Sequence, residues 1–83
     1  MPKGLRSISI STNQFATRVA LDNQNRPEYI GETFPSSQNR TSSPVWRIKK
    51  ITYSAEGEIL SILWANGDAS FNYIWDQRET YTY

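Results

Sequence analysis

The stretch that decides the fold is residues 59–75, ILSILWANGDASFNYIW. Two runs rich in β-branched and aromatic residues, 59–65 and 69–75, flank Asn66 and Gly67. An Asn-Gly pair between such runs is typical of a β-hairpin, because both residues accept the positive φ that a tight hairpin turn needs. The sequence therefore predicts a hairpin centred on these two residues.

The strand pattern continues towards both ends of this hairpin. Residues 45–53 form the longest strand candidate, and residues 55–58 are a predicted turn with Gly57 at positive φ. Residues 59–65 are apolar on both faces, which predicts a central strand covered on both sides. Residues 45–83 hold all three tryptophans and eight of the eleven aromatic residues, so we expect the core there. The predicted core is Trp46, Ile48, Ile51, Leu60, Ile62, Trp64, Phe71, Ile74 and Trp75.

The chain divides into two parts. Residues 1–27 are predicted to be an N-terminal arm or added strands, and residues 28–83 a β domain whose core is 45–83. Residues 36–44 are small or polar and indicate an exposed loop. No amphipathic helix pattern appears. We therefore expect an all-β fold, a small antiparallel sheet or partly open barrel of about four to six strands with an extended N-terminal arm.

The composition excludes most catalytic chemistry. The 83 residues include no cysteine and no histidine, which removes disulfides, thiolate metal sites, the commonest metal ligand and the usual general base. The acidic residues Glu56, Glu58, Asp68 and Asp76 lie in predicted turns or at strand ends. We therefore predict no enzyme activity, no catalytic residue, no metal site and no cofactor. A small domain without such cross-links often depends on oligomerisation.

The charge balance and hydropathy restrict the partners. Nine basic and eight acidic residues give a net charge of +1, so the whole protein is not a polyelectrolyte binder. No apolar run is long enough for a signal peptide or a membrane span, so we expect synthesis in a cytoplasm and no membrane partner.

A nucleic-acid face is one functional hypothesis. Small β modules bind single strands by combining exposed aromatic rings with basic side chains. Such a mixture occurs on the predicted strand 45–53, although its tryptophan is also needed for the core, and its few cations would neutralise few phosphates. The residues of this alternative face are Trp46, Arg47, Lys49, Lys50 and Tyr53.

A protein–protein contact surface is the other hypothesis. A polar arm, an exposed loop and an aromatic C-terminus are features expected of an assembly module, since tyrosines are favoured at protein contacts. The two C-terminal tyrosines could equally close the sheet, and both roles are compatible. The candidate partner-binding residues are Arg6, Ile8, Ile10, Arg18, Arg40, Tyr81 and Tyr83.

A family resemblance adds to these expectations. The ordered elements are Tyr29-Ile30-Gly31, Trp46-Arg47-Ile48-Lys49-Lys50-Ile51-Thr52-Tyr53, Trp64-Ala65-Asn66-Gly67-Asp68, Phe71-Asn72 and Trp75-Asp76-Gln77-Arg78-Glu79-Thr80-Tyr81-Thr82-Tyr83. Together they are similar to a recurring segment, YIG…WxIKKxxY…WAxG…IWxxR…Y, of small virion-associated structural proteins of tailed bacteriophages. The resemblance covers residues 28–83, and the first 27 residues have no counterpart in it.

The resemblance implies a role in the phage particle. It implies a non-enzymatic virion structural protein, either a capsid decoration or a head–tail or tail component, made in the host cytoplasm and located in the virion. Its implied partners are other virion proteins of the capsid, portal or tail, and a homo-oligomer or symmetric array is expected. The alternative remains a small single-stranded nucleic-acid-binding β module.

Overall fold

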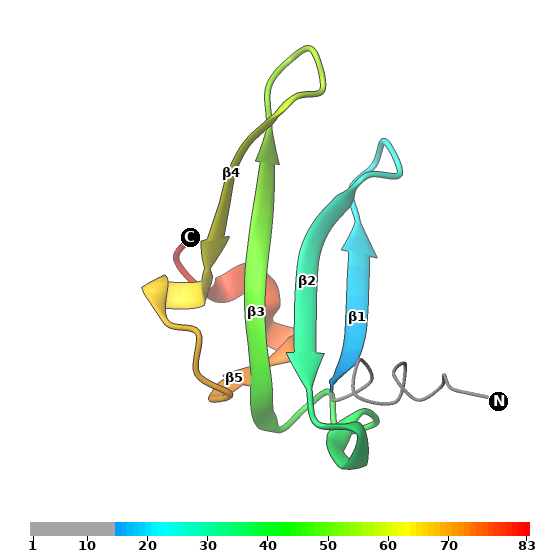
Figure 1. Cartoon of the computed structure of the whole chain (residues 1–83), viewed down its shortest axis with the longest axis vertical. Coiled ribbons are helices and arrows are strands. Elements are labelled where there is room, and N and C mark those ends of the chain that lie inside the picture. Colours follow the sequence, from blue (N-terminus) through cyan, green and yellow to red (C-terminus); the bar gives the residue numbers. More distant parts are fainter. Residues whose placement is uncertain (1–14) are drawn as a thin grey trace, which may run out of the picture.

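The computed structural model describes residues 15–83, which form an open antiparallel sheet of five strands (Figure 1). The first four strands follow one another in the order β1-β2-β3-β4, and the short fifth strand pairs with the beginning of β3. The predicted all-β antiparallel fold is confirmed, as an open sheet. The strands are β1 (Ala16–Leu21), β2 (Pro27–Thr33), β3 (Pro44–Tyr53), β4 (Ile59–Trp64) and β5 (Tyr73–Ile74).

Local hydrogen bonds and one glycine fix the β1–β2 and β3–β4 turns. In the β1–β2 turn, Asp22 Oδ1 accepts hydrogen bonds from the backbone N–H groups of Arg26 and Gln24. Both hydrogen bonds lower the pKa of the Asp22 carboxyl, and the bond from the Arg26 N–H has the larger effect. In the β3–β4 turn, the N–H of Ser54 donates to the carbonyl of Glu58 (2.8 Å), and Gly57 has φ 89°. The predicted positive φ at Gly57 is confirmed.

The Asn-Gly hairpin prediction is wrong, although its turn forms. Asn66 has φ 52° and Gly67 has φ 69°, so the short segment η3 (Ala65–Gly67) is a tight turn with positive φ rather than a regular 3₁₀ helix, closed by the hydrogen bond from the Asp68 N–H to the Ala65 carbonyl (3.0 Å). The chain that follows does not pair with β4. Asp68 accepts hydrogen bonds from the Ser70 N–H (2.9 Å) and the Tyr73 hydroxyl (2.9 Å), which hold the chain in a bend. The next strand, β5, therefore pairs with β3 instead.

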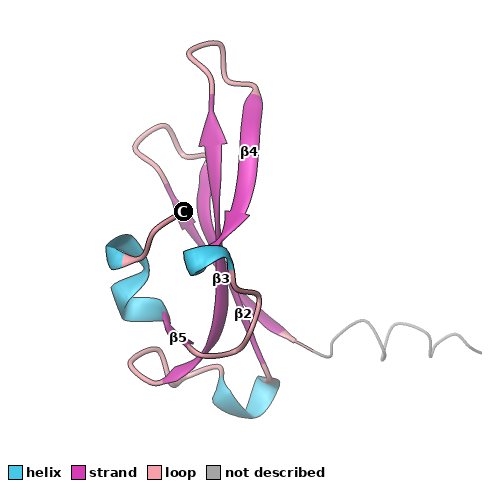
Figure 2. Ribbon diagram, turned by 90° about the vertical axis from the view of Figure 1, so that its left-hand side faces the viewer, coloured by secondary structure: helices cyan, strands magenta, loops and turns pink. Residues whose placement is uncertain are grey.

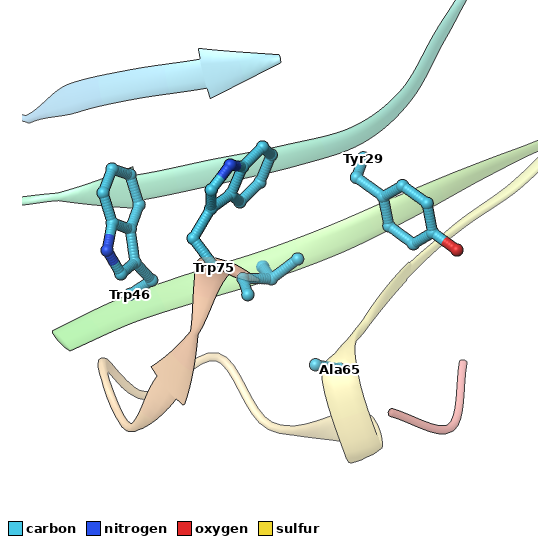
Figure 3. Close-up of a cluster of buried hydrophobic side chains, with 5 residues drawn as sticks. Tyr29, Trp46, Ala65 and Trp75 are labelled. Atoms are coloured by element: carbon cyan, nitrogen blue, oxygen red, sulfur yellow. The ribbon is translucent and has the colours of Figure 1, made fainter. Parts of the chain in front are cut away.

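The C-terminal segment covers one face of the sheet. Figure 2 shows the 3₁₀ segment η4 (Trp75–Thr80) and the C-terminal end on one side of the strands. On this covered face, Trp46 and Ile48 are fully buried, and Trp75 lies between Trp46 and Tyr29 (Figure 3). A Cβ at Gly31 would lie only 2.5 Å from Trp75 Cε3. Because glycine has no side chain, the Trp75 ring can pack directly against the backbone of β2 at this residue.

The position of β4 corrects the prediction of a central strand. Within residues 15–83, β4 pairs only with β3 and is an edge of the sheet, because the chain after η3 turns away to the start of β3. Two residues placed in the predicted core, Leu60 and Ile62, are 64% and 51% exposed. Among the other predicted core residues, the buried ones are Trp46, Ile48, Ile51 and Trp75, and the partly buried ones are Trp64, Phe71 and Ile74.

The predicted loop between β2 and β3 is attached to the core. It begins with the 3₁₀ turn η2 (Pro35–Ser37) and is largely exposed. The indole N–H of Trp46 donates to the carbonyl of Arg40 (3.0 Å), and the N–H of Asp76 donates to the carbonyl of Thr41 (3.0 Å). The tryptophan core therefore fixes the path of this loop.

Candidate interaction surface

The most unusual surface of the described chain is the edge strand β4. Its sequence, ILSILW, contains no charged residue and no proline, two of the features by which proteins protect an edge strand. A third such feature is present, because the pairing with β3 shifts register between Ser61 and Ile59. Four of its aliphatic side chains are about half exposed or more. They are Ile59 (57%), Leu60 (64%), Ile62 (51%) and Leu63 (48%), and we call them the β4 patch.

A groove continues the β4 patch towards the C-terminus. It has a volume of about 510 Å³ and is mainly apolar. One wall is held in place by two hydrogen bonds, from the Asn66 N–H to the Thr82 carbonyl (2.7 Å) and from the Thr82 N–H to Asn66 Oδ1 (3.0 Å). The groove is lined by Ile62, Leu63, Trp64, Asn66, Gly67, Thr82 and Tyr83.

The sheet face opposite the tryptophan core carries an aromatic cluster around one arginine. Phe15, Phe34 and Phe71 lie with ring centroids 5.0 to 5.6 Å apart. The Arg47 guanidinium lies 4.8 Å and 4.9 Å from the rings of Phe15 and Phe71, and its Nε is 2.7 Å from Glu32 Oε1. This arginine is thus occupied by contacts within the domain.

Lys49 places a positive charge beside β4, on the same open face as the phenylalanine cluster. In the strand register Lys49 is opposite Trp64, and its ammonium lies 5.3 Å from the Trp64 ring centroid. The ion pairs found within residues 15–83 are Asp22–Arg26 and Glu32–Arg47, so no carboxylate of this part of the chain pairs with Lys49.

The structure does not bring the predicted nucleic-acid face together. Successive residues of β3 point to opposite faces, so Trp46 and Lys50 lie on the covered face and Arg47, Lys49 and Tyr53 on the other. Trp46 is fully buried, which leaves no ring surface for a base. Tyr53 uses its hydroxyl to donate to a backbone carbonyl of β2 (2.6 Å).

The two C-terminal tyrosines pack against the core. The Tyr81 hydroxyl oxygen accepts a hydrogen bond from the Ile74 N–H (2.9 Å), and the Tyr83 hydroxyl donates to the Arg78 carbonyl (2.8 Å). Burial raises the pKa of Tyr83 above its usual value. Both rings are partly buried and close the covered face, while Tyr83 also lines the groove.

The other predicted contact residues are separated in space or lie outside the described residues. Arg18 is exposed on β1, with its guanidinium 6.0 Å from the Trp46 ring centroid. Arg40 is exposed on the β2–β3 loop, and its carbonyl binds the same indole. The residues outside the described part of the chain are Arg6, Ile8 and Ile10.

The sequence prediction missed the β4 patch. Residues 59–65 have Ser61 as their only polar side chain, and this pattern predicts burial on both sides. The same pattern is compatible with an edge strand that meets another molecule, and composition alone does not separate the two.

Within residues 15–83, no group of three or more acidic side chains is placed to hold a metal ion. No helix in this part of the chain is long and apolar enough to cross a membrane.

Comparison of the chain with protein-family models, with curated proteins and with solved structures found no match. The resemblance to phage virion proteins therefore stays a prediction that rests on the residues quoted for it.

Proposed function

We propose that this chain is a non-enzymatic assembly protein that binds other protein chains through the β4 patch and the adjoining groove. The supporting observation is the set of four exposed aliphatic side chains on an edge strand with no charge and no proline. An edge of this kind can pair with another strand through its backbone, and its side chains supply apolar contact area.

The β4 patch is large enough to matter energetically. Complete burial of an exposed leucine or isoleucine contributes about 1.5 to 3 kcal/mol. Four side chains that are still about half exposed could therefore contribute about 3 to 6 kcal/mol per copy. That gain is of the size needed to offset part of the cost of association, about 4 to 15 kcal/mol, before the groove and backbone hydrogen bonds are included.

In its finer form the proposal places the protein in a phage particle. We propose a virion structural protein, a capsid decoration or a head–tail or tail component, whose partners are capsid, portal or tail proteins. The support is the similarity of residues 28–83 to small virion-associated proteins, together with an apolar surface suited to permanent contacts.

The alternative of a single-stranded nucleic-acid-binding module has weaker support. Its central aromatic residue, Trp46, is buried, and Arg47 is engaged with Glu32. Lys49 and Lys50 then remain on opposite faces, so few phosphates could be neutralised at once.

Size-exclusion chromatography with light scattering separates the two functions. The purified protein is run alone and with a single-stranded oligonucleotide, at low and at moderate salt. Assembly predicts an oligomer whose mass does not depend on the oligonucleotide. A monomer that binds the oligonucleotide with a steep salt dependence would contradict the assembly function.

A further inference from the structure

We propose that Asn66 is a site of spontaneous deamidation whose rate is controlled by its contacts with Thr82. In the native turn the backbone holds the reacting atoms apart. The reaction proceeds when the C-terminal residues detach, and one of its products keeps them from binding again. Asn66 and Gly67 carry this chemistry whether or not β4 binds a partner.

The reaction needs an asparagine that is followed by an unhindered backbone nitrogen. The Gly67 nitrogen attacks Asn66 Cγ, loses its proton and displaces the side-chain amide as ammonia, which leaves a cyclic succinimide. Water then adds to either ring carbonyl and opens the ring to aspartate or isoaspartate. The net change consumes a water molecule, releases ammonia and replaces the amide by a carboxylate. Glycine favours the attack because it has no Cβ beside its nitrogen.

The turn is accessible to the water that the reaction consumes, since Asn66, Gly67 and Thr82 are all exposed. Asn66 is also the only asparagine of the sequence that is followed by glycine. Asn25 provides an internal comparison. It is exposed and has a similar φ of 61°, but Arg26 follows it, and the Cβ of that residue hinders attack by its nitrogen.

The native backbone of Asn66 prevents ring closure. The Gly67 nitrogen must come level with the Asn66 Cβ around the Cα–C bond, which in an L-residue occurs at a ψ of about −120°. Asn66 has ψ 24°, so its side chain lies roughly 140° away from the attacking nitrogen around this bond. The turn must therefore open before Asn66 can react.

Thr82 keeps the turn closed with both polar groups of its backbone. The Asn66 N–H donates to the Thr82 carbonyl (2.7 Å), and the Thr82 N–H donates to Asn66 Oδ1 (3.0 Å). The second bond also fixes the amide group that reacts. Because attack requires local opening, the rate in the folded protein is the rate in the unfolded chain multiplied by the fraction of molecules that are open.

The two products should differ in their effect on the fold. Aspartate keeps a side-chain oxygen where Oδ1 stood, so it can still accept the Thr82 N–H. Isoaspartate carries the main chain through Cγ and lengthens the short turn Ala65–Gly67 by a methylene group. That change moves the hydrogen-bonding groups of residue 66 out of line with Thr82. Isoaspartate therefore keeps the C-terminal residues detached from the end of β4.

Incubation of the full-length protein at mildly alkaline pH tests the site. Peptide mapping by mass spectrometry measures conversion at each asparagine, in buffer and in guanidinium chloride. We expect Asn66 to convert in denaturant and at least about tenfold more slowly in the folded protein, because two hydrogen bonds must open. Asn25 should stay largely unconverted in both. No conversion of Asn66 in denaturant would overturn the site, and equal rates in the two samples would overturn its control by the fold.

Removal of the Thr82 N–H tests the contact. Thr82→Pro lacks this donor, and Tyr81 already has φ −85° and ψ 161°, which suit a residue before proline. The variant should speed conversion of Asn66 in buffer by about fivefold and leave the rate in denaturant unchanged. Thr82→Ala keeps the N–H and is the matched control, with the wild-type rate expected. A wild-type rate in Thr82→Pro would overturn the role of Thr82.

Hydrogen exchange of the wild-type protein measures the same opening without a substitution. The Asn66 and Thr82 amides should exchange more slowly than in an unstructured peptide, and exchange at the peptide rate would overturn the control by Thr82.

The separated products test the structural consequence. Chymotrypsin should cut the isoaspartate form after Tyr81 at least about fivefold faster than the wild type, because cleavage follows the open fraction. Asn66→Asp represents the other product and should be as resistant as the wild type. An isoaspartate form of wild-type resistance would show that the C-terminal residues are not released.

Discussion

Gly31 is the residue at which the two tryptophans of the core meet. A Cβ there would lie 2.5 Å from Trp75 Cε3 and 3.1 Å from Trp46 Cε3. We predict that Gly31→Ala destabilises the protein by about 1 to 3 kcal/mol, because the rigid rings cannot move aside without disturbing the core. Urea unfolding followed by tryptophan fluorescence measures the change.

A second glycine provides the control for this prediction. Gly67 has φ 69° and an open surrounding, so Gly67→Ala introduces backbone strain without overlap and should cost about 1 kcal/mol. It should leave the native fluorescence spectrum unchanged, whereas Gly31→Ala should alter it. Equal stability of Gly31→Ala and the wild type would show that Trp75 does not pack on β2 as described.

Asp68 determines the path of the chain after η3, and it should make the stability of the protein depend measurably on pH in the acid range. The Ser70 N–H, then the Ser70 and Tyr73 hydroxyls, hold the pKa of the Asp68 carboxyl below its ordinary value of 3.8. Its contribution to stability is therefore present above that value and is lost as the pH falls through the lower, folded-state pKa. We predict that Asp68→Asn is less stable than the wild type at pH 6 and that the difference shrinks towards pH 2. Thermal unfolding from pH 2 to 6 measures it, and a constant difference would contradict the prediction.

The C-terminal segment, from η4 to Tyr83, packs over one face of the sheet. Burial, with Tyr29 and Tyr81 nearby, raises the pKa of Tyr83 above the ordinary 10.0. The contribution of the neutral Tyr83 hydroxyl to stability is complete below pH 10. It declines as the pH rises through the folded-state pKa, because this hydroxyl ionises at lower pH in the unfolded chain than in the folded protein. Tyr83→Phe loses the hydrogen bond to the Arg78 carbonyl and should be less stable by about 0.5 to 1.5 kcal/mol at pH 7.

The same variant should lose stability less steeply than the wild type between pH 10 and 12. Denaturant unfolding at fixed pH values in this range gives both slopes. Identical slopes would mean that the Tyr83 hydroxyl is as accessible to water in the folded as in the unfolded protein.

Turns could be predicted from the sequence because their determinants are local. The positive φ values of Gly57 and of Asn66 and Gly67 depend on the conformational freedom of those residues alone. The neighbours of a strand depend on where distant chain segments go. The partner of β4 was wrongly predicted because Asp68 redirects the chain through bonds to Ser70 and Tyr73, which a pattern of alternating residues does not encode.

The candidate site was harder to predict than the fold. A run of apolar residues at the end of a meander has the same pattern whether a neighbouring strand or a second molecule covers it. The tyrosines chosen as contact residues, Tyr81 and Tyr83, are partly used within the domain to close the core. The β4 patch became visible only when the order of the strands was known.

For the whole molecule, the decisive property is that one layer of sheet is covered on one face only. The covered face holds Trp46, Ile48 and Trp75, while the open face of the described residues carries the phenylalanine cluster around Arg47 and the buried side chain of Ile51. A domain of this size without disulfides has little stability in reserve.

The extent of the folding unit can be tested with two truncations. Deletion of residues 1–14 keeps all the strand pairs and ring contacts described for residues 15–83, so we predict that the far-ultraviolet circular dichroism and the thermal unfolding midpoint stay nearly unchanged. Deletion of residues 1–27 should strongly destabilise the protein. It removes β1 along its full pairing with β2, the Phe15 ring from the phenylalanine cluster, and Ala20 from the core. Because the second deletion also exposes β2 as a new edge, we expect it to aggregate or unfold. A folded and soluble product lacking residues 1–27 would show that β1 is dispensable and that the folding unit begins at β2.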